Sequence, residues 1–212
     1  MLVSKTVLEL LDAFSAPTPT PGGGSAAALA GATAASLLAM VAAMPKSKNG
    51  TPEDRAALDA AHPAIMALRA QLVGLIDRDA AAYDLVVAAY RLPKGTDEEK
   101  AARKAAVAHG MRVATDVPLE TVRAAAGLVA QARIVAEHGN PNAKSDVMVA
   151  IQLAMTAMGG GSLNVEANLG GLGDETYAAA VKTEVANLMR ASAEHLKPAS
   201  EALGWKGHKP PA

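Results

Sequence analysis

Residues 26–44 constrain the fold more than any other part of the chain, because no charged residue interrupts them. The stretch is long enough to cross a bilayer as a helix. Most of its side chains are nevertheless small, and a helix with so little bulk gains little from lipid but packs closely against other helices. Its few large side chains are Leu29, Leu37, Leu38, Met40, Val41 and Met44. We therefore predict a buried central helix.

The composition extends this prediction to the whole chain. About a quarter of the 212 residues are alanine, the best helix former, and only 2% are aromatic. The β-branched and aromatic residues that strands prefer are scarce. We predict an all-α, single-domain bundle of seven to nine helices over residues 1–212, in which residues 204–212 form a frayed tail.

Charge and cysteine content exclude several function classes. Lys and Arg number 20 against 21 Asp and Glu, for a net charge of −1, which argues against electrostatic capture of nucleic acid or an acidic membrane. The absence of cysteine excludes disulfides, thiolate metal sites and a cysteine nucleophile, and it fits a reducing cytoplasm. Glu9 and Asp12 in the first helix argue against a signal peptide.

Apolar spacing and end signals place the other helices. An amphipathic helix is expected near residues 3–14, and the P-T-P-T-P-G-G-G-S turn after it supplies Ser25 as the N-cap of the central helix. A helix restarts near Thr51 with Pro52 at its first position, and Ser145 is expected to cap a later helix. The remaining helices are expected at residues 63–90, 97–117, 119–138, 145–158, around 164–168 and 174–203, separated by R-L-P-K-G-T-D, Pro118, Gly139 and the glycines 159–161.

The histidines do not indicate a metal site. No two of the five have a ligand spacing such as H-x-x-x-H, and they fall on separate predicted elements. A strand followed by a glycine loop and a helix, as nucleotide sites require, is missing as well. We expect exposed or helix-capping roles for His62, His109, His138, His195 and His208.

One carboxylate interrupts an apolar stripe of the helix expected at residues 63–90. The stripe, at steps of three and four, consists of Leu68, Leu72, Leu75, Ile76, Tyr83, Val86 and Tyr90. Asp79 fills its gap, whereas Asp77 and Asp84 lie on another face. Burial raises the pKa of a carboxyl group, and a raised pKa suits a general acid or base near neutral pH. The alternative is a structural aspartate paired with a helix end or an arginine.

Two further segments allow a binding or a packing interpretation. The glycines of P-G-G-G-S expose backbone N–H groups at a helix N-terminus, which attracts anions and carbonyl oxygens, but they also let two helices approach closely. Asn164 and Asn168 project two amides from one helical face. An amide offers a donor and an acceptor to the edge of a heterocycle, and it can equally link two helices.

The same segments, in this order and spacing, resemble the cyclodeaminase-type family of folate enzymes. This family includes the C-terminal half of formiminotransferase-cyclodeaminases and stand-alone bacterial methenyltetrahydrofolate cyclohydrolases. The chain departs from the family's usual pattern at the glycines 159–161 and at residues 42–50, where Lys46 and Lys48 replace a compact basic run. The matching strings, within about residues 16–169, are P-T-P-G-G-G-S-A-A-A-L-A-G-A, I-D-R-D-A-A-A-Y-D-L-V, R-L-P-K-G-T-D-E-E-K, D-V-P-L-E, G-N-P-N-A-K-S-D and N-V-E-A-N-L.

The resemblance implies an all-helical homodimer that binds a tetrahydrofolate derivative near the subunit interface, without a metal or redox cofactor. It places the catalytic acid/base on the second aspartate of D-x-D, which is Asp79. Lys94 would meet the glutamate tail, lie near the reacting carbon or remain an exposed loop lysine. The substrate-binding residues implied by the matching motifs are Gly22, Gly23, Gly24, Ser25, Lys94, Asn140, Ser145, Asp146, Asn164 and Asn168.

The implied activity is hydrolysis of 5,10-methenyltetrahydrofolate to 10-formyltetrahydrofolate in cytoplasmic one-carbon metabolism. A chain of 212 residues leaves no room for a transferase domain, and the stand-alone members are of the cyclohydrolase type. The alternatives are a cyclodeaminase that releases ammonia from 5-formiminotetrahydrofolate and a non-catalytic helical dimer that binds folate or a protein.

Overall fold

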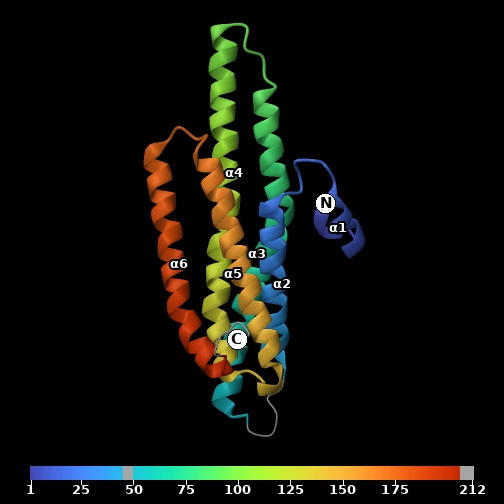
Figure 1. Cartoon of the computed structure of the whole chain (residues 1–212), viewed down its shortest axis with the longest axis vertical. Helices are drawn as coiled ribbons and strands as arrows, with labels where there is room; N and C mark the ends of the chain where they lie inside the picture. The colour runs from blue at the N-terminus through green and yellow to red at the C-terminus, as the bar shows by residue number, and fades with distance from the viewer. Residues whose placement is uncertain (45–49, 206–212) are drawn as a thin grey trace, which may run out of the picture.

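The computed structural model describes residues 1–44 and 50–205, and no strand occurs among them. The prediction of an all-α fold is confirmed. The predicted number of helices, seven to nine, is too high. The described residues form six α-helices, because three predicted breaks lie inside continuous helices. The elements are the 3-10 turn η1 Leu2–Ser4, α1 Val7–Ser15, α2 Gly23–Ala43, α3 Pro52–Tyr90, α4 Asp97–His138, the 3-10 turn η2 Pro141–Ala143, α5 Lys144–Leu169 and α6 Glu175–Leu203 (Figure 1).

Two prolines and a run of glycines lie inside helices where the sequence predicted helix ends. Pro63 is within α3, Pro118 within α4 and the run ending at Gly161 within α5. A proline removes one hydrogen bond of a helix, yet Pro118 is buried where α4 meets α5, and a Cβ on Gly161 would lie 3.0 Å from its carbonyl oxygen. Packing between helices therefore overrides the local signal.

Helix α2 is the buried central helix that its uncharged sequence predicts. It packs against α3, α4 and α5 (Figure 1), and Ala28, Ala35 and Leu38 are fully buried. Small residues allow this close approach, since a Cβ on Gly31 would lie 2.9 Å from a methyl group of Leu72 on α3. By length and hydropathy alone, Gly23–Ala43 and Pro141–Leu169 are each able to span a membrane, and here both are helices of the bundle.

Most helix ends follow the predicted signals, but two predicted caps are wrong. Thr51 caps α3 and Gly139 ends α4, as expected. Gly22 is the N-cap of α2 in place of Ser25, whose hydroxyl is instead bound to α3. Ser145 lies inside α5, because the turn η2 leads directly into that helix. The predicted loop at residues 45–49 and most of the predicted tail, residues 206–212, lie outside the described residues.

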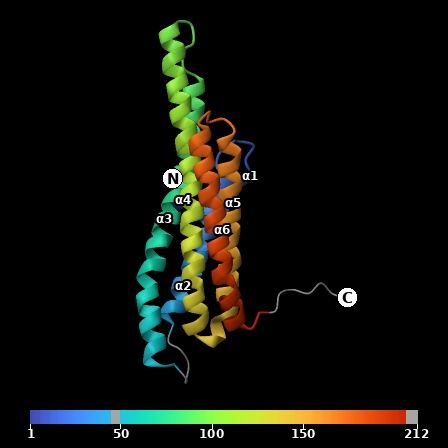
Figure 2. The same cartoon turned by 90° about the vertical axis from the view of Figure 1, so that its left-hand side faces the viewer.

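A two-helix hairpin projects from one end of the bundle. The end of α3 and the start of α4 extend beyond the other helices (Figures 1 and 2). Helix α1 lies to the side of α2 and α3 (Figure 1). The turn η1 before it is attached to α3, because the Leu2 backbone N–H donates a hydrogen bond to the Asp77 carboxylate. The hairpin and the start of α2 together form the surroundings of the site described next.

Candidate functional site

A cavity of about 370 Å³ lies where the N-terminus of α2 meets the base of the α3–α4 hairpin and the C-terminal part of α5. Three segments that the sequence singled out meet here: the glycine turn, the helix of Asp79 and the asparagine pair. The lining residues are Pro19, Thr20, Gly22, Gly23, Gly24, Asp79, Tyr83, Val86, Met111, Ala114, Asn164 and Asn168.

Asp79 reaches the cavity from α3 and contacts the first turn of α2. Its Oδ2 atom lies 2.9 Å from the Ser25 hydroxyl, which is also 2.9 Å from the carbonyl oxygen of Ile76. Ser25 has one hydroxyl proton and donates it to Asp79 when that carboxylate is charged. When Asp79 is protonated, its O–H can donate to Ser25, which then donates to Ile76. The arrangement therefore accommodates both protonation states of Asp79.

Because Gly24 has no side chain, the Asp79 carboxylate can occupy the space beside its backbone. A Cβ on Gly24 would lie 2.0 Å from Oδ1 of Asp79, well inside van der Waals contact. The carboxylate is thereby placed on the N-terminus of α2, where free backbone N–H groups and the helix dipole favour negative charge. The Ser25 backbone N–H supplies one of these hydrogen bonds. The glycine turn thus permits close approach and also forms part of the site.

Burial raises the pKa of Asp79 above that of an ordinary aspartate. Loss of solvent around the charged form is the largest cause, and hydrogen bonds from the hydroxyl and backbone N–H of Ser25 partly offset it by lowering the pKa. Asp79 is only half-buried and lines the cavity, so a ligand can reach it. A carboxyl group of this kind can accept and return a proton closer to neutral pH than an exposed one.

Asn164 and Asn168 form another wall of the cavity. Asn164 Nδ2 donates to the Gly160 carbonyl oxygen at 2.8 Å, and Asn168 Nδ2 donates to the Ala114 carbonyl oxygen of α4 at 2.6 Å. These bonds fix the orientation of both amides. Within the described residues neither Oδ1 atom has a protein partner, so both can accept hydrogen bonds from a ligand. The Nδ2 hydrogen bond of Asn168 to α4 confirms a packing role, and the binding role of the pair stays a prediction.

The sequence interpretation missed part of the cavity wall. Tyr83 and Val86 belong to the α3 stripe of Asp79, which was expected to face the core, but Tyr83 is 41% exposed. The reason is that α3 leaves the bundle at this point, so the same face lines the cavity. Met111 and Ala114 come from α4, whose sequence gave no sign that they approach Asp79.

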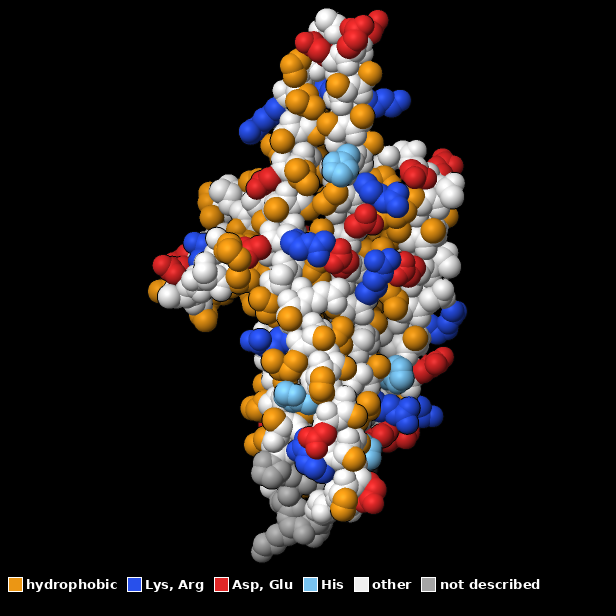
Figure 3. Space-filling model, turned by 180° about the vertical axis from the view of Figure 1, so that it is seen from behind, with side chains coloured by type: hydrophobic (Ala, Val, Ile, Leu, Met, Phe, Trp, Pro, Cys, Tyr) orange, Lys and Arg blue, Asp and Glu red, His pale blue; other side chains and the backbone are white. Residues whose placement is uncertain are grey.

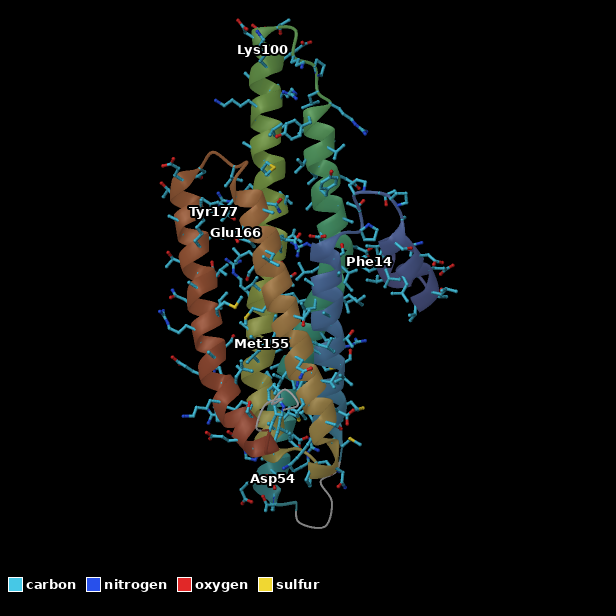
Figure 4. The ribbon with its side chains drawn as sticks, in the orientation of Figure 1. Phe14, Asp54, Lys100, Met155, Glu166 and Tyr177 are labelled. Carbon is cyan, nitrogen blue, oxygen red and sulfur yellow. The ribbon has the colours of Figure 1, made fainter. Side chains whose placement is uncertain are left out.

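Five predicted binding residues do not line this cavity, and one of them, Ser25, is fully buried behind the Asp79 carboxylate that it binds. Asn140 caps the turn η2, and Ser145 and Asp146 lie in the first turn of α5, near the end of the bundle marked by Asp54 in Figure 4. Ser145 and Asn164 are about 28 Å apart along the helix axis. The expectation that the G-N…S-D motif lines the same pocket is therefore wrong within this chain, because α5 is one uninterrupted helix. Lys94 lies in the loop of the hairpin, at a second cavity.

The described residues contain no group of three or more His, Asp or Glu side chains placed to hold a metal ion. His138 Nδ1 lies 2.9 Å from a carboxylate oxygen of Asp54. This histidine occupies the last turn of α4. His208 lies outside the described part of the chain.

Comparison with known proteins gives concordant similarities. A family model described as Formiminotransferase-cyclodeaminase matches residues 6–187. The chain is 42% identical over 178 residues to methenyltetrahydrofolate cyclohydrolase of Methylorubrum extorquens, covering 84% of this chain and 86% of that protein. It is 30% identical over 199 residues to formimidoyltransferase-cyclodeaminase of Gallus gallus, covering 94% of this chain but 36% of that protein.

A solved structure shares the fold. The crystal structure of formiminotetrahydrofolate cyclodeaminase from Thermotoga maritima superposes with a TM-score of 0.84 at 24% sequence identity, covering 96% of this chain and 98% of that one. The all-helical architecture is therefore common to both proteins over nearly their whole length.

Proposed function

This chain belongs to the formiminotransferase-cyclodeaminase family, and we propose that it hydrolyses 5,10-methenyltetrahydrofolate to 10-formyltetrahydrofolate. The main observation behind this proposal is the half-buried Asp79 in an accessible cavity. Ser25 can form a hydrogen bond with Asp79 whether its carboxyl group is charged or protonated. The relative named methenyltetrahydrofolate cyclohydrolase supports it further, since that match covers most of both proteins.

The reaction needs one group that takes up and returns a proton. The methenyl carbon bridges N5 and N10 as a cationic amidinium, which the Asp79 carboxylate stabilises electrostatically. Water adds to this carbon and gives a proton to Asp79, which leaves a neutral tetrahedral intermediate. The C–N5 bond then breaks as Asp79 returns its proton to N5 and the hydroxyl group loses its proton to solvent to form the formyl group. One proton is released overall.

The remaining cavity residues bind and orient the substrate in this proposal. The backbone of Gly22, Gly23 and Gly24 offers a flat approach for the pterin, and the amides of Asn164 and Asn168 meet its hydrogen-bonding edge. Addition of water and transfer of protons involve no change of oxidation state. The proposal therefore assigns no metal or redox cofactor to this chain.

The second candidate is cyclodeamination of 5-formiminotetrahydrofolate. N10 would attack the formimino carbon and ammonia would leave from a similar tetrahedral carbon, so the same carboxylate would serve. The names of several relatives and of the solved structure favour this candidate, whereas the relative of 42% identity favours hydrolysis. A non-catalytic folate-binding dimer is the third candidate, and it gives no role to the raised pKa of Asp79.

We also propose that the protein is a cytoplasmic homodimer formed through the outer face of α2 and α5. These helices pack against each other, and neither Gly23–Ala43 nor residues 147–165 contain a charged residue. Met40, Val149 and Leu163 are nevertheless 42%, 48% and 67% exposed. The opposite side of the molecule carries interspersed positive and negative side chains (Figure 3). An uncharged face across two helices is typical of a subunit interface.

The proposed function is tested by an absorbance assay with 5,10-methenyltetrahydrofolate, run beside the Asp79→Asn variant and a blank without protein. We expect ring opening above the blank, and a kcat about 10²- to 10⁴-fold lower in the variant, because general acid–base catalysis contributes about that much. Circular dichroism of both proteins checks that the fold is kept. Ammonia release from 5-formiminotetrahydrofolate without ring opening would establish the second candidate. If neither ring opening nor ammonia release were detected, the protein would be assigned to the third candidate, a non-catalytic folate-binding dimer.

A further inference from the structure

We propose that Pro118 is a positioning residue of the substrate site. By removing the helical donor of the Ala114 carbonyl oxygen, it holds the Asn168 amide so that its oxygen, together with that of Asn164, accepts both hydrogens of the pterin 2-amino group. This inference rests on the proposed function. It assigns a role to the D-V-P-L-E segment of α4, which the acid–base chemistry of Asp79 does not use.

A proline within α4 changes the hydrogen bonding of the residue four positions before it. In a regular helix the carbonyl oxygen of Ala114 would accept a hydrogen bond from the backbone N–H of residue 118. Pro118 has no N–H, and its ring leaves too little room for that carbonyl in its ideal helical position. Because Ala114 and Pro118 are both buried, a carbonyl oxygen without a donor would be costly at this point.

The side chain of Asn168 supplies the missing donor from the neighbouring helix. Helices α4 and α5 pack side by side (Figures 1 and 2), and Asn168 Nδ2 donates to the Ala114 carbonyl oxygen at 2.6 Å. A carbonyl oxygen can only accept, so the nitrogen of the amide must be the atom that faces α4. Pro118 therefore determines which end of the Asn168 amide is presented to the cavity.

Asn164 presents its amide in the same sense. Its Nδ2 donates to the Gly160 carbonyl oxygen at 2.8 Å, and both asparagines line the Asp79 cavity. Since the two nitrogens are bound to carbonyl oxygens, the atoms left for a ligand are the two Oδ1 oxygens, which only accept. This wall of the cavity favours a group with two N–H donors and disfavours a carbonyl oxygen or an unprotonated ring nitrogen.

The spacing of the two acceptors matches a single amino group. Residues four positions apart on a helix are separated by about 6 Å along its axis, and their Cβ atoms by about 5–6 Å. The hydrogens of a planar amino group diverge by about 120°, so at hydrogen-bond lengths of about 2.9 Å they reach acceptors about 5 Å apart. The pterin carries such a group at position 2, on the opposite side of its ring system from N5. Asn164 and Asn168 therefore bind this end of the pterin while the methenyl carbon lies at Asp79.

The test is a double-mutant cycle in steady-state kinetics with 5,10-methenyltetrahydrofolate. Pro118→Ala restores an N–H to the Ala114 carbonyl and releases the Asn168 amide, whereas Asn168→Ala removes the amide itself. Each should raise KM rather than lower kcat, about three- to tenfold, because one hydrogen bond between neutral groups contributes about that factor. The double variant should match Asn168→Ala alone, since both residues act through one hydrogen bond.

Two further variants separate this role from packing. Pro118→Val restores the same N–H but fills the buried space better than alanine, so it should raise KM as Pro118→Ala does. Pro63→Ala restores an N–H within α3, where the proline is exposed, and should leave KM unchanged. Additive effects of Pro118→Ala and Asn168→Ala, or an unchanged KM in both Pro118 variants, would overturn the positioning role.

Calorimetric binding of 5-formyltetrahydrofolate repeats the cycle without turnover, and the 2-desamino-2-methyl analogue of this ligand identifies the group that is bound. The unaltered protein should prefer the parent compound by about tenfold or more, and Pro118→Ala should narrow this preference as far as Asn168→Ala does. Equal affinity for the two compounds in the unaltered protein overturns the inference, even in an active enzyme. Non-additive binding in a protein that shows neither reaction supports the positioning role, while the proposed function fails.

Discussion

At the scale of single residues, the hydrogen bonds from Ser25 to Asp79 lower the pKa of that carboxyl group. The Ser25 hydroxyl and backbone N–H act against the larger effect of burial on this pKa, so removing the hydroxyl makes the charged form less favourable. We expect the acidic limb of the kcat/KM profile to lie above the ordinary carboxyl range near pH 4, and to move to still higher pH in Ser25→Ala. The measurement is the pH dependence of initial rates in both proteins.

The control for this profile is Ser200→Ala, because the Ser200 hydroxyl bonds only within α6. That variant should reproduce the original limb. If Ser25→Ala left the limb in place, the titrating group would be a residue other than Asp79.

Gly24 determines the position of the carboxylate rather than the stability of the fold. A methyl group in Gly24→Ala would meet Oδ1, Cγ and Oδ2 of Asp79 at 2.0 to 2.8 Å, and the part that must move is the reactive end of a side chain. We expect kcat/KM to fall about 10²-fold, since a shift of about 1 Å in a catalytic group has this effect. Thermal unfolding should change little. Full activity in Gly24→Ala would show that the carboxylate position observed here is not the reactive one.

At the scale of the helix, Gly161 of α5 and Gly74 of α3 differ in the space around them. A Cβ on Gly161 would lie 2.9 Å from a Val122 methyl group and 3.0 Å from the Pro118 carbonyl oxygen, whereas nothing surrounds Gly74 of α3 within 4 Å. Gly161→Ala should therefore lower the free energy of unfolding by about 1–3 kcal/mol, and Gly74→Ala should raise it by about 0.5–1 kcal/mol. Urea unfolding measures both, and equal effects would mean that α4 and α5 are less closely packed.

The close contact between α4 and α5 at Pro118 and Gly161 shows which parts of the fold could be predicted from the sequence and which could not. Patterns within single segments predicted helix over most of every long helix and singled out Asp79, but they divided α3, α4 and α5 into two pieces each. Pro118 and Gly161 were interpreted as helix ends because a local signal does not include the neighbouring helix that each contacts. The same limit explains why Asn140 was wrongly expected in the site: its distance from Asn164 depends on whether α5 is continuous.

At the scale of the whole molecule, the uncharged face of α2 and α5 predicts the oligomeric state. A two-fold interface brings the same surface of both subunits together, so one lysine substitution on this face buries two charges in the dimer. We expect a dimer of the 21.4 kDa chain by light scattering. Met40→Lys and Val149→Lys, which place the charge at residues 42% and 48% exposed in the single chain, should each shift it toward monomer.

Enzymatic activity should depend on dimer formation, because Gly23 of α2 and Asn164 of α5 line the cavity and belong to the two helices of this face. Specific activity of both lysine variants should therefore rise with protein concentration as the dimer reforms by mass action. Ala193→Lys, an exposed position on α6, introduces the same charge away from the face and should remain dimeric and fully active. A wild-type chain that is monomeric and fully active at assay concentration would show that the face of α2 and α5 is not used for self-association.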